Sequence, residues 1–190
     1  MSKVVLEITI SADGYIAGPG ISEEYPLGLN GPLLHEWLFD KQTPADADLL
    51  RHLMNSTGAI ILGHHTYRTA ITDAWGGETP FAAPAFVICH QEPVIKAAGF
   101  NYITTGLADA LQQAQTTAGS KNVWIMGGAS IARQFLEKRW VDALHLHITP
   151  VLLGSGTPLF SPGLFPHLLL DKKRQLDTPG ATHVYYDIVK

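Results

Sequence analysis

The stretch VWIMGGASI, residues 123–131, decides the fold, because an apolar run passes through two glycines into a helical pattern. The apolar run predicts a buried strand over 122–126, and the spacing after it predicts a helix over 130–139. Glycines at such a junction let an anion approach the backbone, where free N–H groups and the helix dipole favour negative charge. We therefore interpret this junction as a candidate phosphate site. A tight turn without a ligand is the alternative, because the pattern is neither a dinucleotide fingerprint nor a P-loop.

A second strand, glycine and helix junction lies at AIILGHHTYR, residues 59–68. The strand predicted over 59–62 runs into Gly63, and two histidines, a threonine and an arginine follow it. Ligands in open α/β sheets lie beyond the carboxyl ends of the strands, so both junctions predict one shared site. A polar turn with no ligand is the alternative for this junction taken alone.

The order of the remaining segments predicts an α/β fold in one domain over residues 1–190. Strands and helices alternate in the first two thirds of the chain, and strands follow strands at the end, which favours a mostly parallel central sheet with C-terminal antiparallel strands. A Thr-Pro-Ala-Asp capping box predicts a helix from 43 that ends at Gly58. The glycine- and proline-rich segment 18–43, with a short helix over 33–39, is long enough to be a functional loop. The other predicted strands cover 4–10, 86–89, 101–104, 144–153, 168–176 and 182–189, and a further helix covers 107–118.

Composition excludes several classes of function. The 190 residues are 46% hydrophobic and 16% charged, with a net charge of −4 and scattered basic residues, which indicates no nucleic-acid partner. The longest apolar runs are far shorter than a membrane span, and no signal peptide is recognisable, so we expect a cytoplasmic protein. The single cysteine, Cys89, forms no internal disulfide. His145 and His147 lie two apart without a recognisable third ligand, so we expect no metal site.

The order of four motifs identifies a family resemblance. SADGYIA at 11–17, LGHHTY at 62–67, MGGAS at 126–130 and VDALHLHITPVLLGSGTPLF at 141–160 follow one another along the chain. Together they resemble the dihydrofolate reductase-like proteins, and among these the C-terminal reductase domain of the bacterial bifunctional riboflavin-biosynthesis deaminase/reductase. The resemblance spans about residues 4–189. It implies a dihydrofolate reductase-like three-layer fold with helices on both faces of the sheet, and a homodimer.

The resemblance also implies a function, namely hydride transfer from NADPH, with NADH as the alternative, to a small heterocyclic substrate such as a pyrimidine or a pterin. It places the nicotinamide beside the residues that follow the first strand. The proton is expected from water or from one of three acids, Asp13, Asp46 or Asp48. The residues implied in cofactor binding are Ile16 and Ala17 at the nicotinamide, Gly63, His64, His65 and Thr66 at the adenosine side, and Gly127, Gly128, Ala129, Ser130 and Ile131 at the pyrophosphate. Arg68, which follows on the same predicted helix, could meet a second phosphate.

Two departures from the family pattern qualify this function. The family has an arginine for the 2′-phosphate of NADPH where this chain has His64, which lacks the bidentate fork, although Arg68 could compensate. An acidic stretch typical of the riboflavin reductases is replaced by Ala70-Ile71-Thr72. No His-x-Glu with Pro-Cys-x-x-Cys is present, so the deaminase half is absent. A second hypothesis is therefore a nucleotide-binding module that retains the fold without catalysis.

Overall fold

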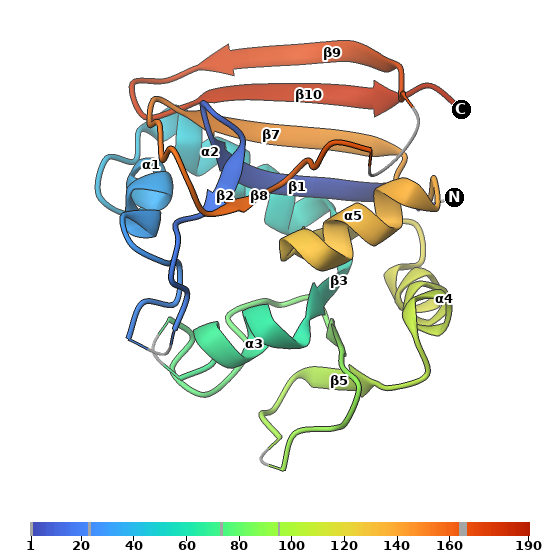
Figure 1. Cartoon of the computed structure of the whole chain (residues 1–190). Coiled ribbons are helices and arrows are strands. Elements are labelled where there is room, and N and C mark those ends of the chain that lie inside the picture. Colours follow the sequence, from blue (N-terminus) through green and yellow to red (C-terminus); the bar gives the residue numbers. More distant parts are fainter. Residues whose placement is uncertain (1, 23, 73, 95, 164–166) are drawn as a thin grey trace.

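The fold is a large sheet with helices on both faces (Figure 1). The computed structural model describes residues 2–22, 24–72, 74–94, 96–163 and 167–190. The elements in chain order are β1 Val4–Ser11, β2 Tyr15–Ala17, the 3-10 helix η1 Gly31–His35, α1 Glu36–Phe39, α2 Pro44–Ser56, β3 Thr57–Gly63, α3 His64–Ala70, β4 Ala85–Ile88, β5 Phe100–Ile103, α4 Leu107–Ala118, β6 Asn122–Gly127, α5 Ala129–Glu137, β7 Ala143–Thr149, β8 Thr157–Pro158, β9 Leu170–Asp177 and β10 Thr182–Ile188.

The main sheet confirms the predicted topology. Within the described ranges it has eight strands in the order β5-β4-β3-β6-β1-β7-β10-β9. The first six are parallel to their neighbours, and β10 and β9 are antiparallel. Since β6 enters between β3 and β1, the strand order reverses there. The carboxyl ends of β3, β6 and β1 therefore lie side by side at a topological switch point, where open α/β sheets bind ligands.

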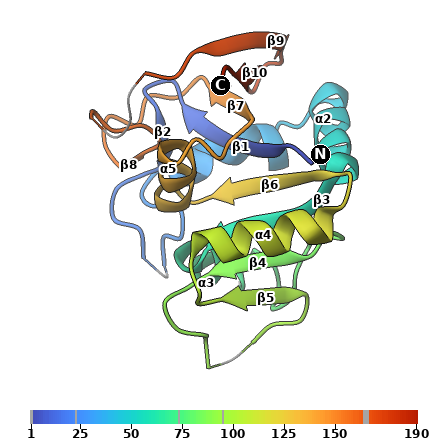
Figure 2. The ribbon, with the colours of Figure 1, turned by 90° about the vertical axis from the view of Figure 1, so that its right-hand side faces the viewer.

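Two hydrophobic clusters hold the helices to the two faces. On one face α4 and α5 pack over the sheet through residues such as Ala114 and Phe135, both fully buried (Figure 2). On the other face Leu53 of α2 and Tyr67 of α3 pack against Trp124 of β6. Apolar burial on both faces is what a mostly parallel sheet requires. This arrangement confirms the predicted three layers.

The structure confirms some of the helix and strand boundaries predicted from the sequence and corrects others. The capping box forms, with Asp46 N–H donating to Thr43 Oγ1 at 3.3 Å and Thr43 N–H donating to the Asp46 carboxylate at 2.8 Å. The prediction that Gly58 ends α2 is wrong, because the helix stops at Ser56 and Gly58 lies inside β3. The predicted strand 144–153 ends at Thr149, before Pro150, which has no N–H to donate. The short pair β2 and β8 was not predicted.

The described helices include none with the length and apolar character to cross a membrane.

Gly58 provides a test of the packing between β3 and α4. A Cβ at this position would lie 2.7 Å from backbone atoms of Ala118 in α4. We expect Gly58→Ala to lower the free energy of unfolding by about 1–3 kcal/mol, because the backbones must move apart. Urea unfolding monitored by circular dichroism measures the change. In the matched control Gly119→Ala nothing lies within 4 Å of the added Cβ, and only strain from a φ of 60° applies, about 1–2 kcal/mol. Equal stability of Gly58→Ala and the wild type would contradict the packing.

Candidate functional site

The two glycine junctions lie against each other at the carboxyl edge of the sheet. A Cβ on Gly63, at the end of β3, would lie 3.0 Å from Ile131 Cγ1 in α5. A Cβ on Gly128, at the start of α5, would lie 3.1 Å from Thr66 Oγ1 in α3. A β-carbon at either position would require its neighbouring side chain to shift, so glycine favours this close approach of the turns after β3 and β6. The structure therefore brings together the two groups of residues that the sequence indicated for the adenosine and pyrophosphate sides.

The start of α5 is open to an anion. Its N-cap is Gly128, no side chain caps the first turn, and no acidic residue lies in that turn. Gly127 has a φ of 115°, in the region that favours glycine, and the Gly127–Gly128 peptide bond is cis. At the start of α3, two residues before Thr66, the Nδ1 atom of His64 is buried and has no hydrogen-bond partner in the described part of the chain. Free N–H groups, a helix dipole and a buried polar atom without a partner fit a phosphate-bearing group.

Asp13 holds the loop that contains Leu153 and Gly154 by hydrogen bonds. Its carboxylate accepts hydrogen bonds from the backbone N–H groups of Gly154 at 2.7 Å and Leu153 at 3.1 Å, and from the hydroxyl of Ser11 at 2.5 Å. The Ser11 hydrogen bond is the largest of the causes that lower the pKa of Asp13. A carboxylate held in its ionised form by several donors is a poor proton donor. Asp13 thus joins the SADG turn to the C-terminal LLGSG motif.

The strand pair β2 and β8 completes this connection. Tyr15 lies opposite Pro158 in the antiparallel pair, and Arg133 of α5 donates to the carbonyl of Leu159 at 3.0 Å. Ala17 is buried, and Ile16 packs against the cluster that contains Ile131 of α5. The residues predicted beside the nicotinamide therefore sit on a small two-stranded sheet that Arg133 links to the helix beginning at the glycine junction.

A cavity of about 830 Å³ opens beside this junction. It lies between segment 24–42, β1, α2 and α3, and Thr66 lines it while also facing Gly128. A cavity of this size suits a small organic ligand. Its wall is mostly aromatic and apolar, with few polar groups. The aromatic and polar residues that line it are Tyr25, Trp37, Phe39, Trp75, Phe81, Trp124, Glu7, Thr9, Glu24, His35, Gln42, Thr66, Thr69 and His147.

Glu7 is a buried carboxylate at the wall of this cavity. It lies on the face of β1 opposite the apolar stripe, and its side chain is 8% exposed. His145 Nδ1 lies 2.8 Å from Glu7 Oε2, and His147 Nε2 lies 3.3 Å from Oε1. Burial raises the pKa of Glu7, but the hydrogen bonds and charges of the two histidines outweigh it and lower the pKa to about 2. Glu7 is therefore ionised at neutral pH.

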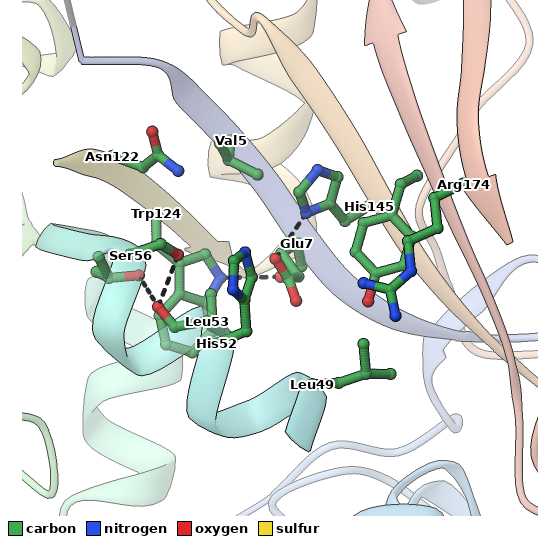
Figure 3. A pocket seen from close by; sticks show the side chains of 12 residues that line it. Val5, Glu7, Leu49, His52, Leu53, Ser56, Asn122, Trp124, His145 and Arg174 are labelled. Carbon is green, nitrogen blue, oxygen red and sulfur yellow. Dashed lines mark hydrogen bonds and ion pairs between the residues drawn. The ribbon is translucent and has the colours of Figure 1, made fainter. Parts of the chain in front are cut away.

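Glu7 also lines a smaller polar pocket of about 190 Å³ on its other side. Figure 3 shows Glu7 and His145 pointing toward one another from β1 and β7, with His52 entering from α2 and Arg174 from β9. The carboxylate thus separates this polar pocket from the large aromatic cavity.

A chain of hydrogen bonds continues from Glu7 to α2. His147 Nδ1 lies 2.8 Å from His183 Nδ1, and His183 Nε2 lies 3.0 Å from the carboxylate of Asp46. Because carboxylates only accept, hydrogen on both Nε2 atoms satisfies Glu7 and Asp46, and a hydrogen bond between the two Nδ1 atoms then requires a third proton between the rings. Burial lowers the pKa of His183, whereas Asp46 and Glu7 favour its charged form, so this third proton is one that the pair can gain or give up. Trp37 covers both rings, with centroid distances of 4.8 and 5.0 Å.

The other two predicted acids differ in their surroundings. Asp46 is fully buried, and although burial raises its pKa, hydrogen bonds led by Thr43 lower it. Asp46 does not line the cavity and meets it only through His183 and His147. Asp48 is exposed and pairs with Arg51 at 2.5 Å, away from the cavity lining. The geometry thus favours an indirect part for Asp46 and supports no catalytic part for Asp48.

Reasoning from the sequence missed Glu7 and the use of His147. The available signal was the second face of β1 and β7, where Glu7, Thr9, His145 and His147 alternate with apolar residues. Both faces of the predicted sheet were expected to be covered by helices, so polar side chains there had to be buried and paired. His145 and His147, considered as metal ligands, instead both contact Glu7, and His147 also contacts His183. The described residues contain no group of three or more His, Cys, Asp or Glu arranged to hold a metal ion.

Comparisons with known proteins give one family. The model of the RibD C-terminal domain family matches residues 2–183. The protein YwjB of Bacillus subtilis (strain 168) is 26% identical over 173 residues, which cover 83% of this chain and 82% of YwjB. The protein YyaP of the same strain is 23% identical, over 83% of this chain and 80% of its own length.

Solved structures share the fold. A riboflavin biosynthesis protein from Shewanella sp. PV-4 superposes with a TM-score of 0.77 at 21% identity, over 100% of both chains. A pyrimidine reductase-like protein from Corynebacterium diphtheriae gives 0.65 at 17%, over 100% of this chain and 92% of its own. A diaminohydroxyphosphoribosylaminopyrimidine deaminase/5-amino-6-(5-phosphoribosylamino)uracil reductase from Thermotoga maritima gives 0.66 at 13%, over 99% of this chain and 57% of its own.

The low pKa of Glu7 predicts a specific loss of stability in acid. A carboxyl whose pKa is lowered from 4.5 to about 2 stabilises the fold above pH 4.5, and this contribution is lost as the pH falls toward 2. We expect the wild type to lose about 3 kcal/mol more than Glu7→Gln between pH 5 and pH 2, measured by urea unfolding at each pH. Glu137→Gln, at the exposed end of α5, is the control and should follow the wild type. Parallel pH profiles for wild type and Glu7→Gln would exclude the charged pairing.

Proposed function

Because the chain belongs to the RibD C-terminal domain family, we propose that it is a reductase that transfers a hydride from NADPH or NADH to a small heterocyclic substrate. The observation that carries this proposal is the position of Thr66. This residue faces the Gly128 turn and also lines the aromatic cavity. A dinucleotide held at the turn would thus be adjacent to a substrate in the cavity. A phosphorylated pyrimidine, of the kind named for the Thermotoga protein, is one substrate class within this proposal.

The cofactor side of the proposal rests on the glycine junction. The N–H groups at the start of α5, in residues 129–131, would hold the pyrophosphate, and residues 63–66 would hold the adenosine side. Bound there, the nicotinamide dinucleotide supplies the hydride. His65 and Arg68 are exposed on α3 and offer positive or polar groups for a 2′-phosphate. His64 in place of arginine weakens that contact, so NADH stays the alternative.

The proton side of the proposal rests on His147. Its ring lines the cavity and belongs to a pair of histidines that, with the third proton bound, carries one positive charge between Glu7 and Asp46. The 3.3 Å separation from Glu7 leaves the Nε2–H weakly bonded, so it can turn toward a basic atom of the substrate. After that transfer His183 can pass the shared proton to His147. The pair thus supplies the proton that accompanies the hydride.

Segment 18–40 is suited to exclude water from the reaction. It passes over the cavity through η1 and α1, and Gly18 and Leu27 are joined by a backbone hydrogen bond of 2.8 Å. A dry cover favours hydride transfer over side reactions. The predicted homodimer and cytoplasmic location stay predictions.

Cofactor binding tests the proposal directly. We expect NADPH or NADH to bind the purified protein with micromolar affinity in calorimetry, and we expect Gly128→Asp to abolish binding, because a carboxylate would face the pyrophosphate. Gly119→Asp adds the same charge at the end of α4 and should bind as the wild type does. Circular dichroism verifies that both variants are folded. Binding that survives Gly128→Asp would exclude the junction, and absence of binding to the wild type would refute the nicotinamide cofactor.

The proton donor is tested by turnover with NADPH. We expect His147→Gln to lower kcat about 10²- to 10⁴-fold and to change its pH profile, while the affinity for NADPH stays within about twofold. His52→Gln, in the exposed polar pocket, is the control and should retain wild-type kcat. If the protein binds NADPH but none of the heterocycles tested causes NADPH oxidation, the result favours the non-catalytic module. Full activity of His147→Gln would exclude this residue as the donor.

A further inference from the structure

The cavity beside the glycine junction is unsuited to a phosphate group. Among the described residues that line it there is no lysine and no arginine, whereas two lining residues are glutamates, Glu7 and Glu24. Glu7 is ionised, since its pKa is lowered to about 2. Phosphate sites in proteins use arginine, lysine or free backbone N–H groups, and a carboxylate at close range repels a phosphate dianion.

Several further donors on or near this wall are already engaged. The N-terminus of α2, which starts next to Gln42, is closed by the capping box of Thr43 and Asp46. The N–H of Gly28 donates to the carbonyl of Tyr25 at 2.9 Å. Burial lowers the pKa of His35, which favours its neutral form, and its buried Nδ1 has no hydrogen-bond partner in the described part of the chain. When the third proton is bound, the charge shared by His147 and His183 is balanced by Glu7 and Asp46.

The same wall is suited to a flat aromatic ring. Trp37, Trp75 and Trp124 line it, with Phe81 packed edge-to-face against Trp75 and Trp124 at centroid distances of 5.6 and 5.7 Å. At the mouth, Phe39 is 73% exposed, and Tyr25 and Met54 are also exposed. Rings of this kind bind planar ligands by stacking and by apolar burial.

Glu7 adds one polar preference. Each of its oxygens meets one histidine, and a carboxylate oxygen has room for a second hydrogen bond. A ring N–H at the end of the cavity would donate to it. A ligand edge that is anionic would be repelled by the ionised carboxylate, and an edge with acceptors only could not donate a hydrogen bond to it.

We propose that this cavity takes an unphosphorylated, uncharged heteroaromatic ring that presents an N–H edge to Glu7. The inference rests on the proposed function in that this ring would be the hydride acceptor. It narrows the substrate class, because it sets aside phosphorylated pyrimidines for this chain. The cavity's preference is itself a binding property, so it is measurable without turnover.

Riboflavin and FMN are a matched pair of probes, since they share one ring with an N–H edge and differ by a phosphate. We expect riboflavin to bind at least about tenfold more tightly than FMN, measured by flavin fluorescence anisotropy. If the protein binds NADP⁺, both titrations are made with NADP⁺ at saturation. Met54→Lys places a cation at the exposed mouth of the cavity and should improve FMN affinity several-fold with little effect on riboflavin. Asn55→Lys adds the same charge to an exposed position of α2 that does not line the cavity, and should change neither.

FMN affinity equal to or above that of riboflavin, absence of binding by both flavins, or no response to Met54→Lys would each overturn the proposal. Failure of the reductase function gives a different result. A protein that prefers riboflavin in this pattern but binds neither NADPH nor NADH would refute the reductase and retain the preference of the cavity. A protein that binds NADPH but prefers FMN would retain the cofactor site and refute the inference.

Discussion

The close packing of the turn after β3 against the turn after β6 is the constraint on which the site depends. Gly63 meets Ile131, and Gly128 meets Thr66, at distances that leave no room for a β-carbon without movement. Because β6 enters the sheet between β3 and β1, the two turns come together from segments about 60 residues apart in the chain. Thr66, which faces Gly128 at the start of α5, also lines the cavity. The candidate anion site and the cavity are therefore neighbours as a result of strand order.

Buried polarity is the second constraint. Glu7, Asp46 and His183 are enclosed in the layer between the sheet and α2, where an unpaired charge would be costly. Pairing two carboxylates with two histidines that share one proton meets this requirement and also places a transferable proton at the cavity wall. The same hydrogen-bonded side chains thus stabilise the buried charges and supply the proton in the proposed reaction. The aromatic side chains around it keep water out and lower the local dielectric.

The motifs at the two ends of the chain form one structural unit. Asp13, in the turn after β1, binds the backbone of Leu153 and Gly154, and β2 pairs with β8. Arg133 of α5 donates to the carbonyl of Leu159, which follows β8, and so links this strand pair to the helix. The co-occurrence of the SADGYIA and LLGSG motifs therefore has a physical basis, because each supplies the hydrogen-bond partners of the other. A substitution in one of these loops would therefore change the position of the strand pair that contacts α5.

The sequence alone determined the order of strands and helices, the parallel-then-antiparallel sheet and both glycine junctions, because hydrophobic period, glycine position and the Thr43 cap act over a few residues. The four sequence motifs, through their resemblance to known reductases, also identified the family. Only the tertiary structure decided that Glu7 faces His145 and His147, that Asp46 is reached through His183, and that the described residues of the cavity wall include two glutamates and no lysine or arginine. These contacts join β1 to β7 and α2 to β10, across 138 residues between Glu7 and His145 and 137 residues between Asp46 and His183. Local patterns indicate which face of a strand a side chain lies on, and the packing of distant elements decides what it meets there.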